Sequence, residues 1–267
     1  MPKAGRYHEG VPCWVVLTTP DLPRAQRFYG ALFDWGFVPT GPAEAVATRY
    51  GAQVAAIAAT TAAGTPEGAR EPGAAAASGA PDAAWTTYLA CADLPHTAAL
   101  VRAAGGRIVR EPYEVPDQGH AALAVDPLGA VFGLWRAGAI DGAGLVDEPG
   151  AFAWNEHRSP APDTARDFYR RVFGYGYDRP AAGSTVFRVD GRPAGGIGPA
   201  GTGAPAWLTH FATADADRAA ALVRALGGTV LTGPGPTPSG RAALVRDDAG
   251  ALFTLIGVPP GESAAAA

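Results

Sequence analysis

The chain has 267 residues and a mass of 27.1 kDa, with 48% hydrophobic and 17% charged residues. This composition is typical of a folded globular protein, and the length allows one large core or two ordinary ones. The net charge of −4 and the pI near 5.7 give no attraction to phosphate backbones or anionic membranes, so nucleic acid and membranes are not expected partners.

The cysteines and the amino terminus indicate the compartment. Cys13 and Cys91 lie in apolar, strand-like segments without a Cys-x-x-Cys pair, so we expect buried thiols and neither a disulfide nor a zinc site. The first ten residues hold no apolar signal core, and no run of about 20 apolar residues occurs in the sequence. We therefore expect a cytoplasmic protein.

Residues 12–37 predict a strand followed by an amphipathic helix. An apolar run of strand length comes first, and apolar side chains then recur at helical spacing. Asp21 and Pro23 are typical of a helix start, because aspartate can accept a hydrogen bond from a free amide and proline has no amide there to leave unpaired. Gly36 is expected at the helix stop.

Three short strands are predicted after this helix, at 37–39, 46–50 and 54–59. They complete a module of one strand, one helix and three strands over residues 11–59. Residues 60–83 are polar and small without periodicity, which predicts a loop that buries little surface.

A second module over residues 84–136 has the same order of elements. Its helix is closed by Gly105-Gly106, and its last two strands are joined by an Asp-x-x-Gly turn from Asp126 to Gly129. Aspartate can cap such a turn and glycine can supply a positive φ, so we predict a hairpin.

The second half of the chain repeats both modules, with Trp154 matching Trp14 and Gly176 matching Gly36. One module cannot bury both faces of its sheet alone, so modules should pair into curved sheets with a concave face, either within each half or by exchange between halves. We assign residues 1–136 to an N-terminal domain (modules 11–59 and 84–136, loop 60–83), 137–150 to a linker, 151–258 to a C-terminal domain (modules 151–199 and 206–257), and 259–267 to a disordered tail.

This pattern resembles the vicinal oxygen chelate superfamily, which includes glyoxalase I, the bleomycin resistance proteins and the extradiol dioxygenases, and most of all its two-domain actinobacterial branch. The resemblance covers residues 11–257 and rests on the Trp-bearing strand, the Phe-Tyr helix ending at Phe-x-x-Gly, the Gly-Gly pair and the Asp-x-x-Gly-x-x-Phe hairpin. It implies an α+β fold in which four βαβββ modules pair into two eight-stranded cup-shaped sheets.

The resemblance also implies where a metal would be held, namely by His or Glu on a first strand and Glu on a last strand. A divalent ion needs three or four converging N, O or S ligands. The last strands at 53–59 and 192–198 offer no carboxylate or imidazole. In this sequence the first-strand positions are Trp14, Thr86, Trp154 and Leu208, and the last-strand positions are Gly133 and Thr254. We therefore expect no metal and no other cofactor.

Aromatic residues stand in place of those ligands. Alternate residues of a strand share a face, so the first cup should be lined by Trp14, Val16, Thr86, Tyr88 and Trp135. Such a surface is suited to stacking a planar polycyclic ligand. The alternative is that these rings simply fill a cup that takes no ligand.

The second cup should differ, because Glu156 and His210 can point inward together. They could act as an acid/base couple without a metal or hold a hydroxyl and a carbonyl of a ligand. Alternatively, Glu156 holds a backbone amide and His210 is a satisfied core histidine. Trp85 and Trp207 have the opposite parity and are expected in the helix-packing core. The complete set of predicted ligand-binding residues is Trp14, Val16, Thr86, Tyr88, Gly133, Trp135, Trp154, Glu156, His210 and Thr254.

The favoured function is metal-independent binding of a hydrophobic, polycyclic aromatic natural product, in resistance, sequestration or product handling during antibiotic biosynthesis. A biosynthetic enzyme would then be a further partner, and the protein would be a monomer or a homodimer. The alternative is a metal-free isomerase, lyase, cyclase or hydroxylase-type tailoring enzyme that uses Glu156 and His210 as catalytic residues. A structural protein with filled cups explains the aromatic lining least well.

Overall fold

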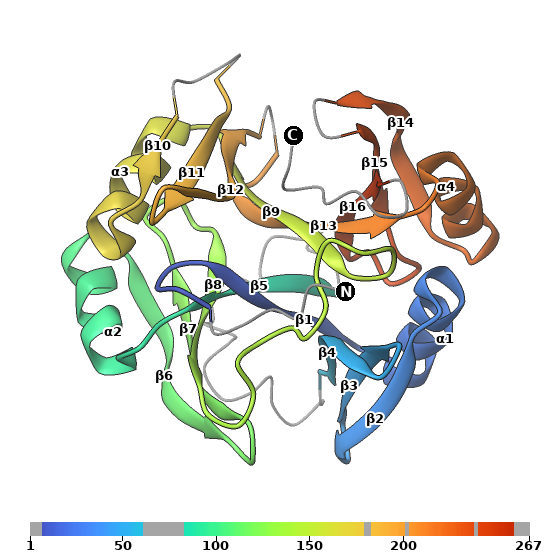
Figure 1. Ribbon diagram of the computed structural model, residues 1–267, viewed down its shortest axis with the longest axis horizontal. Coiled ribbons are helices and arrows are strands. Elements are labelled where there is room, and N and C mark those ends of the chain that lie inside the picture. Colours follow the sequence, from blue (N-terminus) through green and yellow to red (C-terminus); the bar gives the residue numbers. More distant parts are fainter. Residues whose placement is uncertain (1–6, 61–82, 179–182, 201–202, 238–239, 259–267) are drawn as a thin grey trace.

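The computed structural model describes residues 7–60, 83–178, 183–200, 203–237 and 240–258. The predicted tail at 259–267, and the predicted loop at 60–83 except for its two end residues, lie outside this part of the chain. Within it, two eight-stranded sheets carry four helices (Figure 1). None of these helices is long and apolar enough to cross a membrane.

The order strand, helix and three strands occurs four times along the chain. The first module has β1 (Pro12–Thr19), α1 (Leu22–Phe33), β2 (Gly36–Gly41), β3 (Glu44–Arg49) and β4 (Ala52–Ala59), and the second has β5 (Ala84–Ala90), α2 (Leu94–Ala103), β6 (Arg107–Val115), β7 (Gly119–Val125) and β8 (Val131–Ala137). The third has β9 (Phe152–Ser159), α3 (Pro162–Phe173), β10 (Gly176–Tyr177), β11 (Thr185–Val189) and β12 (Arg192–Pro199), and the fourth has β13 (Ala206–Thr213), α4 (Ala216–Ala225), β14 (Thr229–Thr237), β15 (Gly240–Arg246) and β16 (Leu252–Gly257).

The modules pair within each half of the chain. The first sheet has the order β2-β3-β4-β1-β5-β8-β7-β6, and the second has the order β10-β11-β12-β9-β13-β16-β15-β14. In both, the two modules join through their antiparallel first strands, and the last strand of each module runs parallel to its first. The predicted α+β fold with two curled eight-stranded sheets is confirmed, and the pairing that the sequence left open is now known.

The start of α1 and the Gly105-Gly106 stop of α2 follow the sequence, since the amide of Gly106 donates to the carbonyl oxygen of Val101 at 2.9 Å, but the predicted stop of α1 does not. Asp21 caps α1, because its Oδ1 accepts a hydrogen bond from the amide three residues later at 2.9 Å. The stop predicted at Gly36 is wrong. Gly36 and its counterpart Gly176 open β2 and β10. The two helices end one residue before Asp34 and Gly174, whose φ angles of 56° and 70° turn the chain out of the helix.

The two halves pack back to back, so that their concave faces point away from each other (Figure 1). Helix α1 contacts α4 and helix α2 contacts α3 across the boundary. In the middle, where β5 meets β13, the hydroxyl of Thr87 donates a hydrogen bond to Oδ1 of Asn155 at 2.8 Å. Two hydrophobic clusters each contain buried side chains of both halves.

The connection between the halves is packed against the first sheet. Ala137 still belongs to β8, and the segment after it lies along β1 and β4. The amide of Ala143 donates to the carbonyl oxygen of Cys13 at 2.8 Å, and the amide of Gly144 donates to that of Gln53 at 2.8 Å. The segment predicted as a linker is therefore part of the fold.

Candidate ligand-binding site

The concave face of the first sheet encloses a cavity of about 690 Å³. This volume lies in the range of roughly 300–1,000 Å³ that is typical of small-molecule pockets. Large aromatic side chains from β1, β5, β6 and β8 form much of its lining. They are Trp14, Trp85, Tyr88, Tyr113 and Trp135.

The strand register explains why the predicted residues of the first cup share this face. Strands β1 and β5 pair with Trp14 opposite Tyr88 and Val16 opposite Thr86, so alternation directs all four into the cavity. Trp135 on the neighbouring β8 lines the cavity as well. Trp14 and Trp135 are each only 4% exposed, so packing holds their rings in place.

Small side chains from β4 and the turn before β3 line another part of the cavity. Ala43, Ala56, Ala58 and Ala59 all contact the open space. Ala56 pairs directly with Val16 across the β1–β4 ladder. Because an alanine side chain extends little from the sheet, these residues leave room that the aromatic residues do not fill.

A polar end is formed by β6 and β3. The guanidinium of Arg110 lies over the ring of Tyr113, with its central carbon 3.3 Å from the ring centroid, and Glu44 and Glu114 stand at the exposed rim. Burial raises the pKa of Tyr88 well above its ordinary value, Tyr113 raises it further, and Arg110 acts in the opposite direction. Tyr88 is therefore a neutral phenol at physiological pH.

Sequence reasoning missed Arg110 and Tyr113. The period-two rule fails on β6, because the ladder with β7 shifts its register between Ile108 and Arg110 and again between Arg110 and Tyr113. Such bulges redirect side chains. The sequence Arg-Glu-Pro-Tyr, with a proline inside a predicted strand, was the available signal.

Gly133, which was predicted to contact ligand, is covered by another residue. It pairs with Tyr88 in the β5–β8 ladder, and a β-carbon at Gly133 would overlap the ring of Tyr88. Gly133 is accordingly absent from the cavity lining. The ring of Tyr88 takes the space in which the resemblance would place a metal-binding carboxylate.

The second cup brings Glu156 and His210 together, as the alternation of β9 and β13 predicts. Oε2 of Glu156 lies 3.7 Å from Nε2 of His210 and 3.0 Å from Nε of Arg158. His210 pairs with Trp154 on β9 and with Thr254 on β16. The four residues predicted for this cup therefore lie close together, away from the cavity of the first sheet.

The charge state of Glu156 is set by competing effects. Burial raises its pKa, but the contacts with His210 and Arg158 outweigh burial, so the pKa of Glu156 lies below its ordinary value. Its carboxylate lies against the backbone of β12, where a β-carbon at Gly198 would come within 2.7 Å of Oε1. A carboxylate with a lowered pKa is a weak proton acceptor at neutral pH.

The side chains at the implied metal positions do not fit a divalent ion. Within the described ranges, no three His, Cys, Asp or Glu side chains gather at a point where they could share an ion. Tyr88 fills the space at Gly133, and Trp14 and Trp154 offer no ligand atoms.

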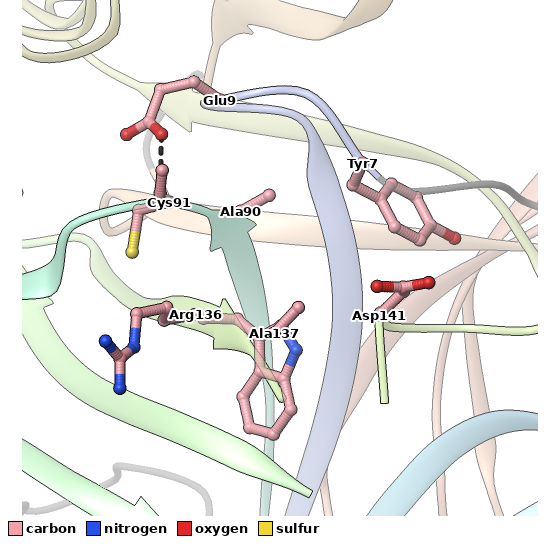
Figure 2. Close-up of a pocket in the computed structure, with 9 residues that line it drawn as sticks. Tyr7, Glu9, Ala90, Cys91, Arg136, Ala137 and Asp141 are labelled. Carbon is pink, nitrogen blue, oxygen red and sulfur yellow. Dashed lines mark hydrogen bonds between the residues drawn. The ribbon is translucent and has the colours of Figure 1, made fainter. Parts of the chain in front are cut away.

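A second pocket, of about 450 Å³, is lined by Glu9, Cys91 and Arg136 (Figure 2), and it shares Trp135 with the lining of the main cavity. Two of its charged groups already have structural roles. Glu9 accepts a hydrogen bond from the amide of Ala92 at 2.7 Å, and Arg136 contacts the His120 ring at 3.0 Å. Burial raises the pKa of the Cys91 thiol to about 12, so a reactive thiolate is not available there.

Comparison with known proteins places the fold in a family. The model of the Glyoxalase/Bleomycin resistance protein/Dioxygenase superfamily matches residues 13–134 and 157–255. The chain belongs to this superfamily. The resemblance inferred from the sequence is confirmed.

Similar proteins of known sequence cover nearly all of this chain. CFP32 of Mycobacterium tuberculosis, provisionally named a glyoxylase, is 37% identical over 273 residues that cover 97% of this chain and 99% of the relative. The anthracycline biosynthesis protein DnrV of Streptomyces peucetius is 33% identical over 274 residues, which cover 98% of each chain.

Solved structures share the fold at low identity. The Mn(II)-bound glyoxalase from Novosphingobium aromaticivorans superposes with a TM-score of 0.63 at 17% identity, over 93% of this chain and 83% of the other. The 2,3-dioxygenase LapB from Pseudomonas sp. KL28 also gives 0.63, at 13% identity over 93% of each chain. At these identities the likeness concerns the fold alone.

Proposed function

We propose that this superfamily member binds a planar, hydrophobic, polycyclic aromatic natural product in the cavity of its first sheet, without a metal. The observation that carries the proposal is the cavity itself, whose aromatic lining is buried and fixed on strands. Aromatic rings held in this way can stack on a flat ligand and gain both area burial and ring–ring attraction. Alanine side chains leave the space that such a ligand needs.

The relatives support a biosynthetic setting. DnrV is named an anthracycline biosynthesis protein, and its similarity extends over 98% of this chain. The binding proposed here would serve product handling, sequestration or resistance during antibiotic biosynthesis. In that setting the protein would act in the cytoplasm and exchange its ligand with a biosynthetic enzyme.

The proposal is tested by titrating the intrinsic tryptophan fluorescence with a panel of flat aromatic compounds of increasing ring number. Saturable quenching that strengthens from two to four fused rings is expected, with the unaltered compound recovered after incubation. Absence of saturable quenching by every member of the panel would contradict the proposal. Appearance of a new product would move the assignment to an enzyme.

A second candidate function is a metal-free isomerase, lyase, cyclase or hydroxylase-type tailoring enzyme. The proximity of Glu156 and His210 in the second cup favours it. The lowered pKa of Glu156 argues against a general base there, because such a base works best with a pKa near the working pH. Product analysis of the same titration mixtures separates the two functions.

A further inference from the structure

Arg110 is a half-buried cation in the wall of the aromatic cavity. Its guanidinium is stacked on the ring of Tyr113, with its central carbon 3.3 Å from the ring centroid. This contact covers one face of the guanidinium, while the N–H groups project along its edges. This arrangement prepares the group to donate hydrogen bonds in one plane.

The donors of Arg110 have no acceptor among the described residues. Neither an ion pair nor a hydrogen bond joins its guanidinium to another residue of this part of the chain. The carboxylate that follows it, Glu111, is paired with Arg102 on α2. A guanidinium without acceptors in the wall of a cavity can serve a ligand.

The other charged residues at this end do not cancel Arg110. Glu44 and Glu114 are exposed at the rim, where water screens their charge, whereas Arg110 is half buried. The charge of Arg110 also reaches into the cavity. Burial, Tyr113 and, more weakly, Glu44 raise the pKa of the Tyr88 phenol, and Arg110 opposes that rise with a larger effect than that of Glu44.

We propose that Arg110 recognises a carboxylate at one end of a planar aromatic ligand. The inference rests on the proposed function, since it assumes that the ring system of the ligand lies against Trp14 and Trp135. A carboxylate placed in the plane of the guanidinium can accept two parallel N–H···O hydrogen bonds. The ligand class is therefore an aromatic acid, bound with its rings in the cavity and its acid group at β6.

The test compares anthracene-2-carboxylate with anthracene-2-carboxamide, which has nearly the same shape but no charge. Calorimetric titration at pH 7 should show that the wild-type protein binds the acid at least tenfold more tightly than the amide. Arg110→Met should abolish this preference and leave the affinity for the amide within about twofold, because Met keeps an unbranched apolar stem over Tyr113. Arg224→Met removes an exposed arginine at the end of α4, outside the cavity, and serves as the control.

The outcomes separate this inference from the proposed function. Equal affinity of the wild type for acid and amide, or a preference that survives in Arg110→Met, would overturn the role of Arg110 and leave aromatic binding standing. Failure of both probes to bind the wild type would overturn both. If Arg110→Met does not fold, Arg110→Lys carries the test, since loss of the planar fork should reduce the preference for the acid several-fold.

Discussion

The hydroxyl of Tyr29 donates a hydrogen bond to Oδ2 of Asp247 at 2.9 Å, and this bond ties α1 of the first half to the last hairpin of the second. The repeat produces the equivalent contact with the two halves exchanged: Tyr169 of the second half donates to Oδ2 of Asp126 in the first half at 3.2 Å. The other oxygen of each aspartate accepts backbone amides of its own turn, at 2.9 Å for Ala130 and 2.7 Å for its counterpart. Each aspartate therefore shapes a hairpin and holds the two halves together.

Loss of the Tyr29 hydroxyl should destabilise the protein more than loss of the Tyr169 hydroxyl. Asp126 keeps a second partner, since Nε2 of His157 lies 2.7 Å from its Oδ2, whereas the buried Asp247 would keep only its turn amides. Tyr29→Phe should lower the free energy of unfolding by about 1–3 kcal/mol. Urea denaturation of both variants measures the difference, and a larger loss for Tyr169→Phe would contradict this account.

Gly133→Ala should be destabilising because the added β-carbon overlaps the Tyr88 ring. Overpacking of this kind costs about 1–3 kcal/mol. Gly41→Ala is the matched control, since no atom lies within 4 Å of a β-carbon there. Combining Gly133→Ala with Tyr88→Ala should cost less than the sum of the two changes. Additive losses in thermal or urea unfolding would show that the ring does not cover this position.

Much of the fold could be predicted from local pattern. The apolar strand before Asp21 and the Asp-x-x-Gly turn at Asp126 predicted the elements, and the alternation of residues on β1 and β5 placed Trp14 and Tyr88 on one face. Trp85 and Trp207 were expected in the helix-packing core, and their indole N–H groups do donate to Tyr29 and Tyr169 at 2.9 and 2.8 Å. Both tryptophans also line the cavity, which their expected place in the core did not predict.

The parts that could not be predicted depend on irregular backbone or on contacts between halves. Arg110 lines the cavity because the β6–β7 ladder shifts its register next to it. The regular alternation of residues along a strand does not predict such a shift. The buried pair of His157 and Asp126 joins residues far apart in the sequence. The alternation of residues on β9 turns His157 to the face opposite Glu156, but the docking of the two halves that gives it Asp126 as a partner has no local signature.

Glu156→Gln tests the charge in the second cup through pH. The folded-state pKa of Glu156 is lowered, so its contribution to stability is present above the unfolded pKa and is lost as pH falls through the folded one. At pH 7 the variant should be less stable than the wild type by about 1 kcal/mol. That gap should close in urea titrations as the pH falls below about 4. A gap of constant size from pH 7 to 3 would contradict the assigned shift.

The same variant separates binding from catalysis. If the second cup is catalytic, Glu156→Gln and His210→Ala should abolish product formation while a ligand still binds. Because we place ligand binding in the first cup, we expect no product from the wild type and nearly unaltered affinity in both variants. Wild-type turnover that disappears in Glu156→Gln would show that the protein is an enzyme and that Glu156 is catalytic.

Chelation should leave the purified protein unchanged. The side chains at the implied ligand positions cannot hold a divalent ion, so treatment with EDTA should not shift the melting temperature or the affinity for an aromatic ligand. Elemental analysis of the purified protein checks the same point. About one equivalent of zinc, iron, manganese or nickel per chain, removed together with stability, would contradict this prediction.

The central claim is that the cavity of the first sheet is the ligand site, and the repeat supplies a matched pair of variants to test it. Trp14→Ala and Trp154→Ala remove equivalent indoles from the two cups, and thermal melts monitored by circular dichroism verify that both variants fold. Calorimetric titration with one planar polycyclic probe should show that Trp14→Ala binds more than tenfold more weakly than the wild type, because a stacked indole contributes about 1–3 kcal/mol. Trp154→Ala should bind like the wild type. The reverse result, with binding lost in Trp154→Ala and kept in Trp14→Ala, would contradict the claim.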